Sequence, residues 1–406
     1  MTSEDQRVAY FPDGYYEVDG LANTARHFEA FAGRHGLPFL MVHSGPRTEV
    51  ERNGSVTRIQ LRRSFATFLL DRGHHFDLLF TRHYKEVASR VREFNPDLIQ
   101  ITGPGDVGIL GALIAHKLHI PLAATWQTNL HEYAARRVAS ATRFLPKRTS
   151  EWFSRAAERW SFRALARFYK IPRFLFAPNP EVIRLLENAT GKPCSIMPHG
   201  VDTNVFSPRW RDRATGPAAP LKIGYVGRLT PEKNVRVLAR IEQELRKKGH
   251  NDFEFVVVGE GLELGWLREN MRNAVFPGVL TGKELSRAFA NMDIFVFPSE
   301  TDTFGLVVLE AMASGVPAIV SSSGGPKYTV QHGKNGFVAN NLPEFVNIIE
   351  GFLAQRDLLA SYRIAAREFA VGTSWEQVFE RMYGTYEGYL HASSVIRDRV
   401  LDAALT

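Results

Sequence analysis

The sequence predicts an α/β protein made of two Rossmann-like halves. With 406 residues, the chain is long enough for two domains of ordinary size. Short apolar stretches alternate with helical segments in both halves, and this alternation favours parallel sheets. A polar stretch rich in Pro, Gly and Ala, residues 209–220, separates the halves and is typical of a linker. We therefore expect an N-terminal domain over 1–207 and a second domain over 208–373.

The first half opens with a strand, a glycine loop and a helix. The strand is expected at 7–11, the loop contains Asp19 and Gly20, and the helix follows at 21–34. In doubly wound folds this order makes an approach site for a phosphate or a sugar. A plain connection between a strand and a helix would show the same pattern, so both interpretations stand at this point.

Further strands of the first half are expected at 38–44, within 97–108 and at 121–126. Ligands of parallel sheets gather at the carboxyl ends of the strands. The loop at 103–106 and the segment 125–133 should therefore lie beside a ligand.

The second half begins with a strand at 222–227, which ends at Gly227. Arg228 and Lys233 follow it, and Pro231 and Glu232 between them suit the first turn of a helix. Two cations at the carboxyl end of a strand indicate a phosphate site, because Arg binds phosphate oxygens as a fork and Lys as a point charge. A surface pair at the start of a helix is the alternative.

A second loop in this half, after a strand at 293–297, also favours an anion. The helix should begin at about Phe304, with Thr301, Asp302 and Thr303 capping its first amide groups. Gly305 lets another group come close to the backbone there. Unpaired amides and the helix dipole attract a phosphate to such a point.

Composition limits the class of protein. Apolar residues make up 44% of the chain, as in soluble globular proteins, and no apolar run is long enough for a membrane span. The N-terminus lacks a signal segment, and the single cysteine, Cys194, cannot form an internal disulfide, so we expect a cytoplasmic protein. Cys194 itself is expected to fill space in a strand.

The net charge of +7 is concentrated in the first half. Residues 1–205 contain 27 Lys or Arg against 20 Asp or Glu, and residues 132–173 alone contain 11 against 3. Aromatic residues interleave with arginines at every fourth position of this segment, namely Arg155, Arg159, Arg163 and Arg167. The segment 134–174 could lie on an anionic membrane, or its aromatic residues could pack into the core. A groove for an anionic soluble acceptor is a third possibility, and nucleic acid fits poorly because no recognition motif is present.

The stretch 297–317 resembles a signature of retaining nucleotide-sugar glycosyltransferases of the GT-B fold. In that family an acidic residue is followed by seven other residues and then by Glu, with Phe-Gly or Leu-Gly between the two acids. Here Asp302 stands where Glu is commoner, and Glu310 completes the pattern. The sequence TDTFGLVVLEAMASGVP is most similar to that of the branch that includes lipid mannosyltransferases and sulfoquinovosyl transferases. The resemblance implies two Rossmann-like domains facing each other across a cleft. A final helix over about 374–406 would return to the first domain.

The resemblance also implies roles for individual residues. Arg228 and Lys233 would hold the donor diphosphate, Asp302 the donor sugar, and Glu310 the ribose. No metal or other cofactor would be required, because the cations and main-chain amides neutralise the leaving group. The remaining expected donor contacts are Asp19, Gly20, His199, Gly227, Gly259, Glu260, Leu280, Thr303, Phe304, Gly305 and Leu306.

One position departs from the family pattern. Gln127 stands where relatives usually have a His that is thought to aid catalysis, and an amide cannot act as a base. Altered chemistry, lower activity and an engineered substitution all remain open. The expected function is therefore transfer of a hexose from a UDP- or GDP-sugar to a lipid or other hydroxyl acceptor. A sugar-nucleotide epimerase or a catalytically impaired sugar-nucleotide binder is the alternative.

Overall fold

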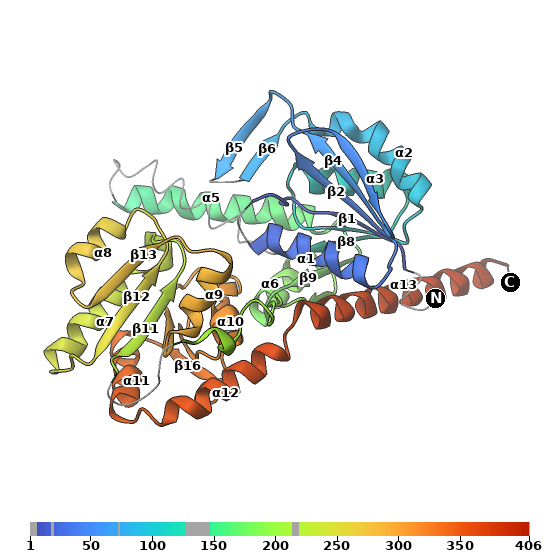
Figure 1. The fold of residues 1–406 in the computed structure, drawn as a ribbon. Coiled ribbons are helices and arrows are strands. Elements are labelled where there is room, and N and C mark those ends of the chain that lie inside the picture. The colour runs from blue at the N-terminus through green and yellow to red at the C-terminus, as the bar shows by residue number, and fades with distance from the viewer. Residues whose placement is uncertain (1–5, 18–19, 72–73, 127–146, 213–218, 406) are drawn as a thin grey trace. The chain divides into compact units, whose positions relative to one another are not determined.

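The computed structural model describes residues 6–17, 20–71, 74–126, 147–212 and 219–405. The chain divides into two compact units (Figure 1). Unit 1 comprises residues 1–198 and 378–406, and unit 2 comprises residues 199–377. No helix in the described residues is both long enough and apolar enough to cross a membrane.

Unit 1 is built on a mostly parallel sheet, which in the described residues has eight strands in the order β10-β9-β8-β7-β1-β2-β4-β3. Only β3 runs antiparallel to its neighbour, β4. The strands are β1 (Val8–Phe11), β2 (Phe39–Gly45), β3 (Glu49–Asn53), β4 (Val56–Arg62), β7 (Leu98–Ile101), β8 (Leu122–Thr125), β9 (Phe174–Ala177) and β10 (Cys194–Ile196). The strands β1, β7, β8 and β9 are buried along their whole length, as expected for a sheet covered on both faces.

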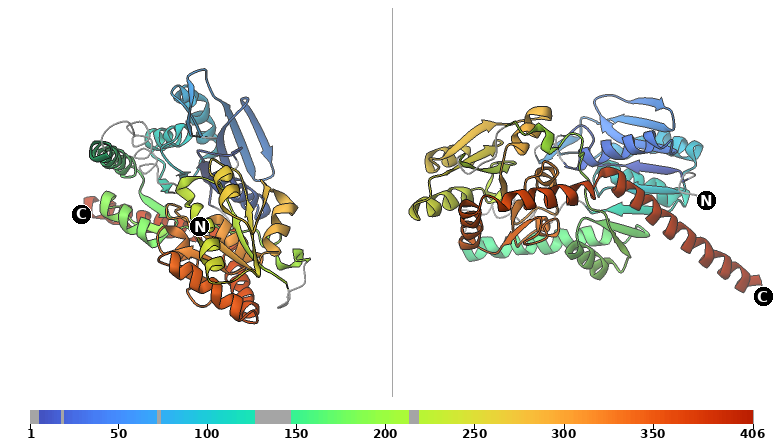
Figure 2. Two further views of the ribbon diagram at one scale, coloured as in Figure 1. Left: turned by 90° about the vertical axis from the view of Figure 1, so that its left-hand side faces the viewer. Right: turned by 60° about the horizontal axis from the view of Figure 1, so that its bottom comes forward.

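Helices cover this sheet, and one of them comes from the C-terminal end of the chain. They are α1 (Gly20–Arg34), α2 (Tyr84–Phe94), α3 (Asp106–Leu118), α5 (Lys147–Phe168), α6 (Pro180–Thr190) and α13 (Trp375–Leu405), with a short η2 (Phe80–His83). The ring of Phe379 on α13 stacks on Phe28 of α1, with centroids 4.5 Å apart. Figure 2 shows the last part of α13 running beyond the other elements of unit 1.

A separate two-stranded ribbon belongs to unit 1, formed by β5 (Thr67–Asp71) and β6 (His74–Asp77) (Figure 1). The pairing is antiparallel, and Phe68 lies opposite Phe76. The sequence patterns described above did not predict this hairpin or the β3–β4 pair.

Unit 2 has a fully parallel sheet, with the order β13-β12-β11-β14-β15-β16 in the described residues. Its strands are β11 (Leu221–Val226), β12 (Phe253–Val258), β13 (Ala274–Gly278), β14 (Ile294–Phe297), β15 (Ala318–Ser321) and β16 (Gly336–Ala339). Its helices are α7 (Arg236–Lys247), α8 (Leu264–Asn270), α9 (Gly282–Ala290), α10 (Leu306–Ala313), α11 (Leu342–Ala354) and α12 (Leu358–Val371), with short η3 (Pro208–Trp210), η4 (Pro231–Lys233) and η5 (Gly325–Tyr328).

The division between the units falls at 198/199 and 377/378, whereas the sequence patterns placed it at 207/208 and 373/374. Hydrogen bonds explain why residues 199–207 belong to unit 2. The guanidinium of Arg367 on α12 donates to the carbonyl oxygens of Thr203 and Phe206. The amide of Val201 donates to the carbonyl oxygen of Thr373 at 3.2 Å. These contacts hold the segment against α12, upstream of the polar linker.

The helix α5 separates its aromatic residues into two groups. Phe162, Leu165 and Phe168 pack against the core of unit 1. On the exposed side, 69% of Trp160 and 42% of Phe153 remain accessible to solvent. Arg155, Arg159, Arg163 and Arg167 are all exposed as well. The core-packing interpretation is therefore correct for one face of the helix, while the opposite face presents arginines with two aromatic side chains.

Candidate functional site

The candidate site of unit 2 lies where the direction of strand order reverses. From β11 the chain proceeds outward to β12 and β13, whereas β14, β15 and β16 extend to the other side of β11. In open parallel sheets ligands bind at such a switch point, beyond the carboxyl ends of the strands. The loops that follow β11 and β14 carry the residues that the sequence singled out.

Lys233 and Asp302 meet at this point. Lys233 ends the short helix η4 after β11, and Asp302 lies in the loop after β14. The Lys233 Nζ donates to Asp302 Oδ1 at 2.6 Å, and both side chains are mostly buried. The second carboxylate oxygen of Asp302 is buried and has no hydrogen-bond partner in the described chain. The two loops are also joined by the Thr301 hydroxyl, which donates to the carbonyl oxygen of Glu232.

Arg228 lies on the same loop as Lys233 but is more exposed. Half of its side chain is accessible, and its guanidinium lies 3.6 Å from the carboxylate of Glu232. Its carbonyl oxygen accepts a hydrogen bond from the Tyr225 hydroxyl at 3.0 Å. Burial, followed by the nearby charge of Asp302, raises the pKa of Tyr225 well above its ordinary value, while Arg228 opposes that rise. The two loops therefore place opposite charges around one buried hydroxyl.

The helix α10 begins at Leu306 and has Gly305 as its N-cap, so the expected start at Phe304 was two residues early. The N-cap is therefore Gly305, which has no side chain that could cap the first amides. A left-handed φ of +79° and the nearness of the Pro326 ring favour glycine there. Asp302 pairs with Lys233 instead. The first amides of α10 consequently receive no side-chain hydrogen bond from the N-cap residue, Gly305.

Glu310 is the acidic residue at the end of the motif. It lies on α10 and is partly buried. Burial raises the pKa of its carboxyl group to about 7. Within the described part of the chain, no neighbouring group offsets this rise in pKa by favouring the charged form. An acceptor of hydrogen bonds is therefore available on the second turn of the helix.

Glycines bring the neighbouring loops close together. A Cβ atom at Gly259, which follows β12, would lie 2.0 Å from the carbonyl oxygen of Gly227. The amide of Leu229 donates to the carbonyl oxygen of Glu260 at 2.9 Å. The Glu260 side chain itself is exposed, whereas Leu280 packs partly against the core. Glycine at position 259 therefore allows the backbones of the two loops to approach each other closely.

His199 and Phe304 form an aromatic pair. Both side chains are buried, and their rings meet edge to face with centroids 5.0 Å apart. Burial lowers the pKa of His199 to about 4, so the imidazole is neutral near pH 7. Of the other predicted donor contacts in unit 2, Thr303 lies in the loop just before Phe304.

In unit 1, Gly20 is the first residue of α1, and its carbonyl oxygen accepts a hydrogen bond from the Thr24 hydroxyl. Asp19 and Gln127, also predicted as site residues, lie outside the described residues, as does the part of the basic segment before 147. The described residues contain no cluster of His, Cys, Asp or Glu side chains suited to a metal ion.

The sequence analysis missed Asp13, which follows β1. Its carboxylate accepts hydrogen bonds from the amides of Gly105 and Gly108 at 3.2 and 3.0 Å. Burial raises its pKa to about 6, with a further contribution from the charge of Asp106. The N-terminus of α3 is therefore already capped by a side chain. The spacing of glycines at 103, 105 and 108 was the available signal, since each makes room for this carboxylate or for the turn around it.

Comparisons with known proteins agree with this architecture. The family model described as Glycosyltransferase Family 4 matches residues 18–205, and the model described as Glycosyl transferases group 1 matches residues 220–355. A GDP-mannose-dependent alpha-mannosyltransferase of Mycolicibacterium smegmatis is 31% identical over 317 residues, which are 75% of this chain and 77% of that protein. Sulfoquinovosyl transferase SQD2 of Arabidopsis thaliana is 29% identical over 395 residues, covering 92% of this chain and 72% of that protein.

The solved structure of sucrose-phosphate synthase from Thermosynechococcus elongatus is similar in fold, with a TM-score of 0.71 at 18% identity. The match covers 95% of this chain and 100% of that chain. Two Rossmann-like units with these sheets place the protein in the GT-B fold class. Both family models and the relatives support one conclusion: the chain belongs to the family 4, or group 1, glycosyltransferases.

Proposed function

We propose that this glycosyltransferase moves a hexose from a nucleoside diphosphate sugar to an acceptor hydroxyl, with retention at the anomeric carbon. The contact between Lys233 and Asp302 at the switch point is the observation that carries the proposal. In the proposal, this cation and the first amides of α10 would face the negative charge of a leaving diphosphate. The second oxygen of the Asp302 carboxylate is buried without a partner among the described residues, and this supports a role for it as an acceptor for sugar hydroxyls.

In this mechanism the positive groups stabilise the departing diphosphate. Lys233, Arg228 and the amides of Gly305 and Leu306 oppose the charge that develops as the glycosidic bond breaks. Preorganised groups of this kind contribute about 3–4 kcal/mol each. Asp302 would hold hydroxyls of the donor sugar and Glu310 the ribose. We propose that no metal ion takes part, because these groups already neutralise the diphosphate.

The acceptor is proposed to be a lipid or a lipid-linked hydroxyl at a membrane surface. Its support in this chain is the exposed side of α5, which carries four arginines together with Trp160 and Phe153. Basic residues with aromatic neighbours are typical of helices that lie in the interface of an anionic bilayer. Names of the relatives, a mannosyltransferase and a sulfoquinovosyl transferase, make mannose and a sulfonated hexose suitable first choices for the donor sugar.

A donor panel followed by a turnover assay tests this proposal. Thermal unfolding with GDP-, UDP- and ADP-sugars would identify the donor, because a ligand stabilises the folded form in proportion to its affinity. Release of nucleoside diphosphate should then rise when lipid extract is added and should persist in EDTA. Nuclear magnetic resonance of the product should show the anomeric configuration of the donor.

Other outcomes would contradict the proposal. An isomerised donor without acceptor would identify an epimerase, and binding without turnover would identify an impaired sugar-nucleotide binder. In the second case, Gln127→His should be assayed. A large gain of turnover would show that the glutamine impairs an enzyme of the proposed type.

A further inference from the structure

The sheet of unit 1 also has a switch point, which lies between β1 and β7. From β1 the strand order continues through β2 on one side, whereas β7, β8, β9 and β10 extend to the other side. The strands β1 and β7 are parallel neighbours, with Phe11 opposite Ile101 at their carboxyl ends. A ligand of such a sheet binds beyond the carboxyl ends of the strands at the switch point. Side chains that follow β1 and β7 are therefore the first candidates for ligand contact in unit 1.

Asp13 follows β1 and reaches the loop after β7. Its carboxylate accepts hydrogen bonds from the amides of Gly105 and Gly108, and its own amide donates to the Thr102 hydroxyl at 2.8 Å. The residue is nevertheless only partly buried. A carboxylate has about four lone-pair sites, so the two amides leave room for a further hydrogen-bond donor. Asp13 is thus a fixed carboxylate at the switch point with unused capacity to accept.

Capping of α3 alone does not call for a charged residue at position 13. Asn and Ser cap helices about as well as Asp, and neither would repel the carboxylate of Asp106 in the first turn of α3. Burial raises the pKa of Asp13 to about 6, and the charge of Asp106 adds to this rise although the amides of Gly108 and Gly105 oppose it. The charged form is therefore unfavourable in the free protein. A carboxyl group of this kind at the ligand edge of a sheet is typical of a functional residue.

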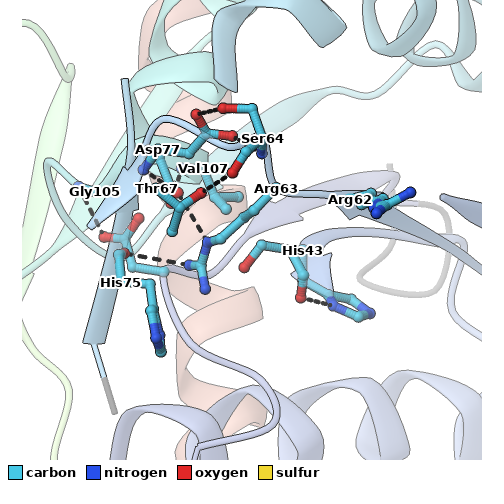
Figure 3. A network of polar contacts seen from close by, with 12 residues as sticks. His43, Arg62, Arg63, Ser64, Thr67, His75, Asp77, Gly105 and Val107 are labelled. Carbon is cyan, nitrogen blue, oxygen red and sulfur yellow. Dashed lines mark hydrogen bonds and ion pairs between the residues drawn. The ribbon is translucent and has the colours of Figure 1, made fainter. Parts of the chain in front are cut away.

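The neighbouring cations are paired with other carboxylates. Asp106 pairs with Arg63 at 3.1 Å and accepts a hydrogen bond from the amide of Asp77, and Asp77 pairs with Arg82 at 2.8 Å. Figure 3 shows Arg63 and Asp77 in this network at the start of α3. Both arginines are consequently engaged, and the charge of Asp13 is left for a ligand to compensate.

This arrangement favours an uncharged hydrogen-bond donor as that ligand. The amide of Val107 donates to Asp106, and the amide of Gly108 donates to Asp13. A phosphate therefore cannot use these amides as it does at an open helix N-terminus, and the two carboxylates would repel it. A hydroxyl group, by contrast, can donate to Asp13 and stabilise its charged form.

We propose that Asp13 is a specificity-determining residue of unit 1, which accepts a hydrogen bond from the acceptor hydroxyl. This inference rests on the proposed function and deepens it. The acceptor presents an uncharged hydroxyl group, rather than a phosphate, at the carboxyl ends of β1 and β7. Acceptor binding should then follow the ionisation of Asp13, because only the carboxylate can accept with both oxygens.

Transfer kinetics at saturating donor test the proposal, with lipid extract as the source of acceptor. Asp13→Asn keeps the shape of the side chain and a carbonyl oxygen for the helix amides, but it lacks the charge. Its kcat/KM for the acceptor should fall about ten- to a hundred-fold, the effect of losing one hydrogen bond to a charged group. Asp97→Asn is the matched control. Asp97 is partly buried like Asp13 and accepts a hydrogen bond from the amide of Arg7 at 2.9 Å, at the amino ends of the same two strands. The control should leave this kcat/KM unchanged.

The pH profile separates this role from a purely structural one. With a pKa of about 6, the charged fraction of Asp13 rises about ten-fold between about pH 5 and pH 7. The kcat/KM for the acceptor should rise by the same factor in the wild type and in Asp97→Asn, whereas Asp13→Asn should lose this rise. Burial raises the pKa values of Tyr10 and Tyr169, which also feel the charge of Asp13, so both hydroxyls stay neutral over this range. A contribution from Glu310 would be common to all three proteins.

Several results would overturn the proposal. They are a wild-type kcat/KM for the acceptor in Asp13→Asn, a wild-type pH profile in that variant, and a product in which the new sugar is linked to a phosphate. Thermal stabilisation by the donor should be the same in both variants as in the wild type, which checks that they are folded. Failure of the wild type to transfer sugar to any acceptor would instead count against the proposed function.

Discussion

Replacing Lys233 by Met removes the cation that the structure places at the switch point of unit 2. The Nζ of Lys233 lies 2.6 Å from Asp302 and is largely shielded from water, so screening of its charge is weak. If this cation stabilises the departing diphosphate, its loss should cost about 3–4 kcal/mol in the transition state. At saturating donor, kcat should therefore fall by about 10²–10³.

Stability must be separated from chemistry in this experiment. Lys233→Met leaves the partly buried Asp302 carboxylate unpaired, which should lower the free energy of unfolding by about 1–3 kcal/mol. The double variant Lys233→Met/Asp302→Asn should recover part of that stability without recovering kcat. A matched control is Lys248→Met, which breaks another 2.6 Å pair in unit 2, to Glu350 at a more exposed place. The control should keep normal turnover, and a Lys233→Met enzyme with more than a tenth of the wild-type kcat would refute the reasoning.

Three further outcomes are expected. Asp293→Ala leaves two mostly buried arginines without their shared carboxylate and should lower the free energy of unfolding by about 3–5 kcal/mol, measured by urea denaturation. The raised pKa of Glu310 means that the folded state binds a proton more tightly than the unfolded chain. Stability should therefore fall as pH rises from about 4.5 to about 7, and Glu310→Gln should flatten this slope. Gly305→Ala should lower the midpoint of thermal unfolding and the affinity for the donor. A Cβ atom there would lie 2.9 Å from Pro326, on a backbone in the left-handed conformation. The control Gly351→Ala, in an open helical position, should change neither quantity.

Local sequence patterns predicted the elements around the site better than the contacts within it. Two apolar runs stop at Gly227 and at Pro298, and they predict where β11 and β14 end. These ends place the loops of Arg228 and Asp302. The ion pair of Lys233 with Asp302 joins positions 69 residues apart, so no local pattern specifies it. Its formation also explains why Asp302 is not the N-cap of α10, because the carboxylate is directed to Lys233.

Long-range contacts likewise account for what the sequence patterns missed in unit 1. Asp13 caps a helix whose first amides are 92 and 95 residues away. The β5–β6 hairpin depends on Asp77, which bonds to Asp106 across 29 residues. In α5, by contrast, the helical period alone puts the side chains of Phe162 and Trp160 on different faces. Side chains of residues two positions apart on a helix point to different sides.

The pairing at the switch point bears on how the donor would be received. Asp302 holds Lys233 with one oxygen, and its other oxygen is buried without a partner. A buried acceptor without a hydrogen bond is costly, and a donor hydroxyl would relieve that cost on binding. Lys233 has further N–H groups that a phosphate oxygen could engage without breaking the ion pair. The ion pair would then orient both groups before the donor arrives, so that binding needs little rearrangement of either side chain.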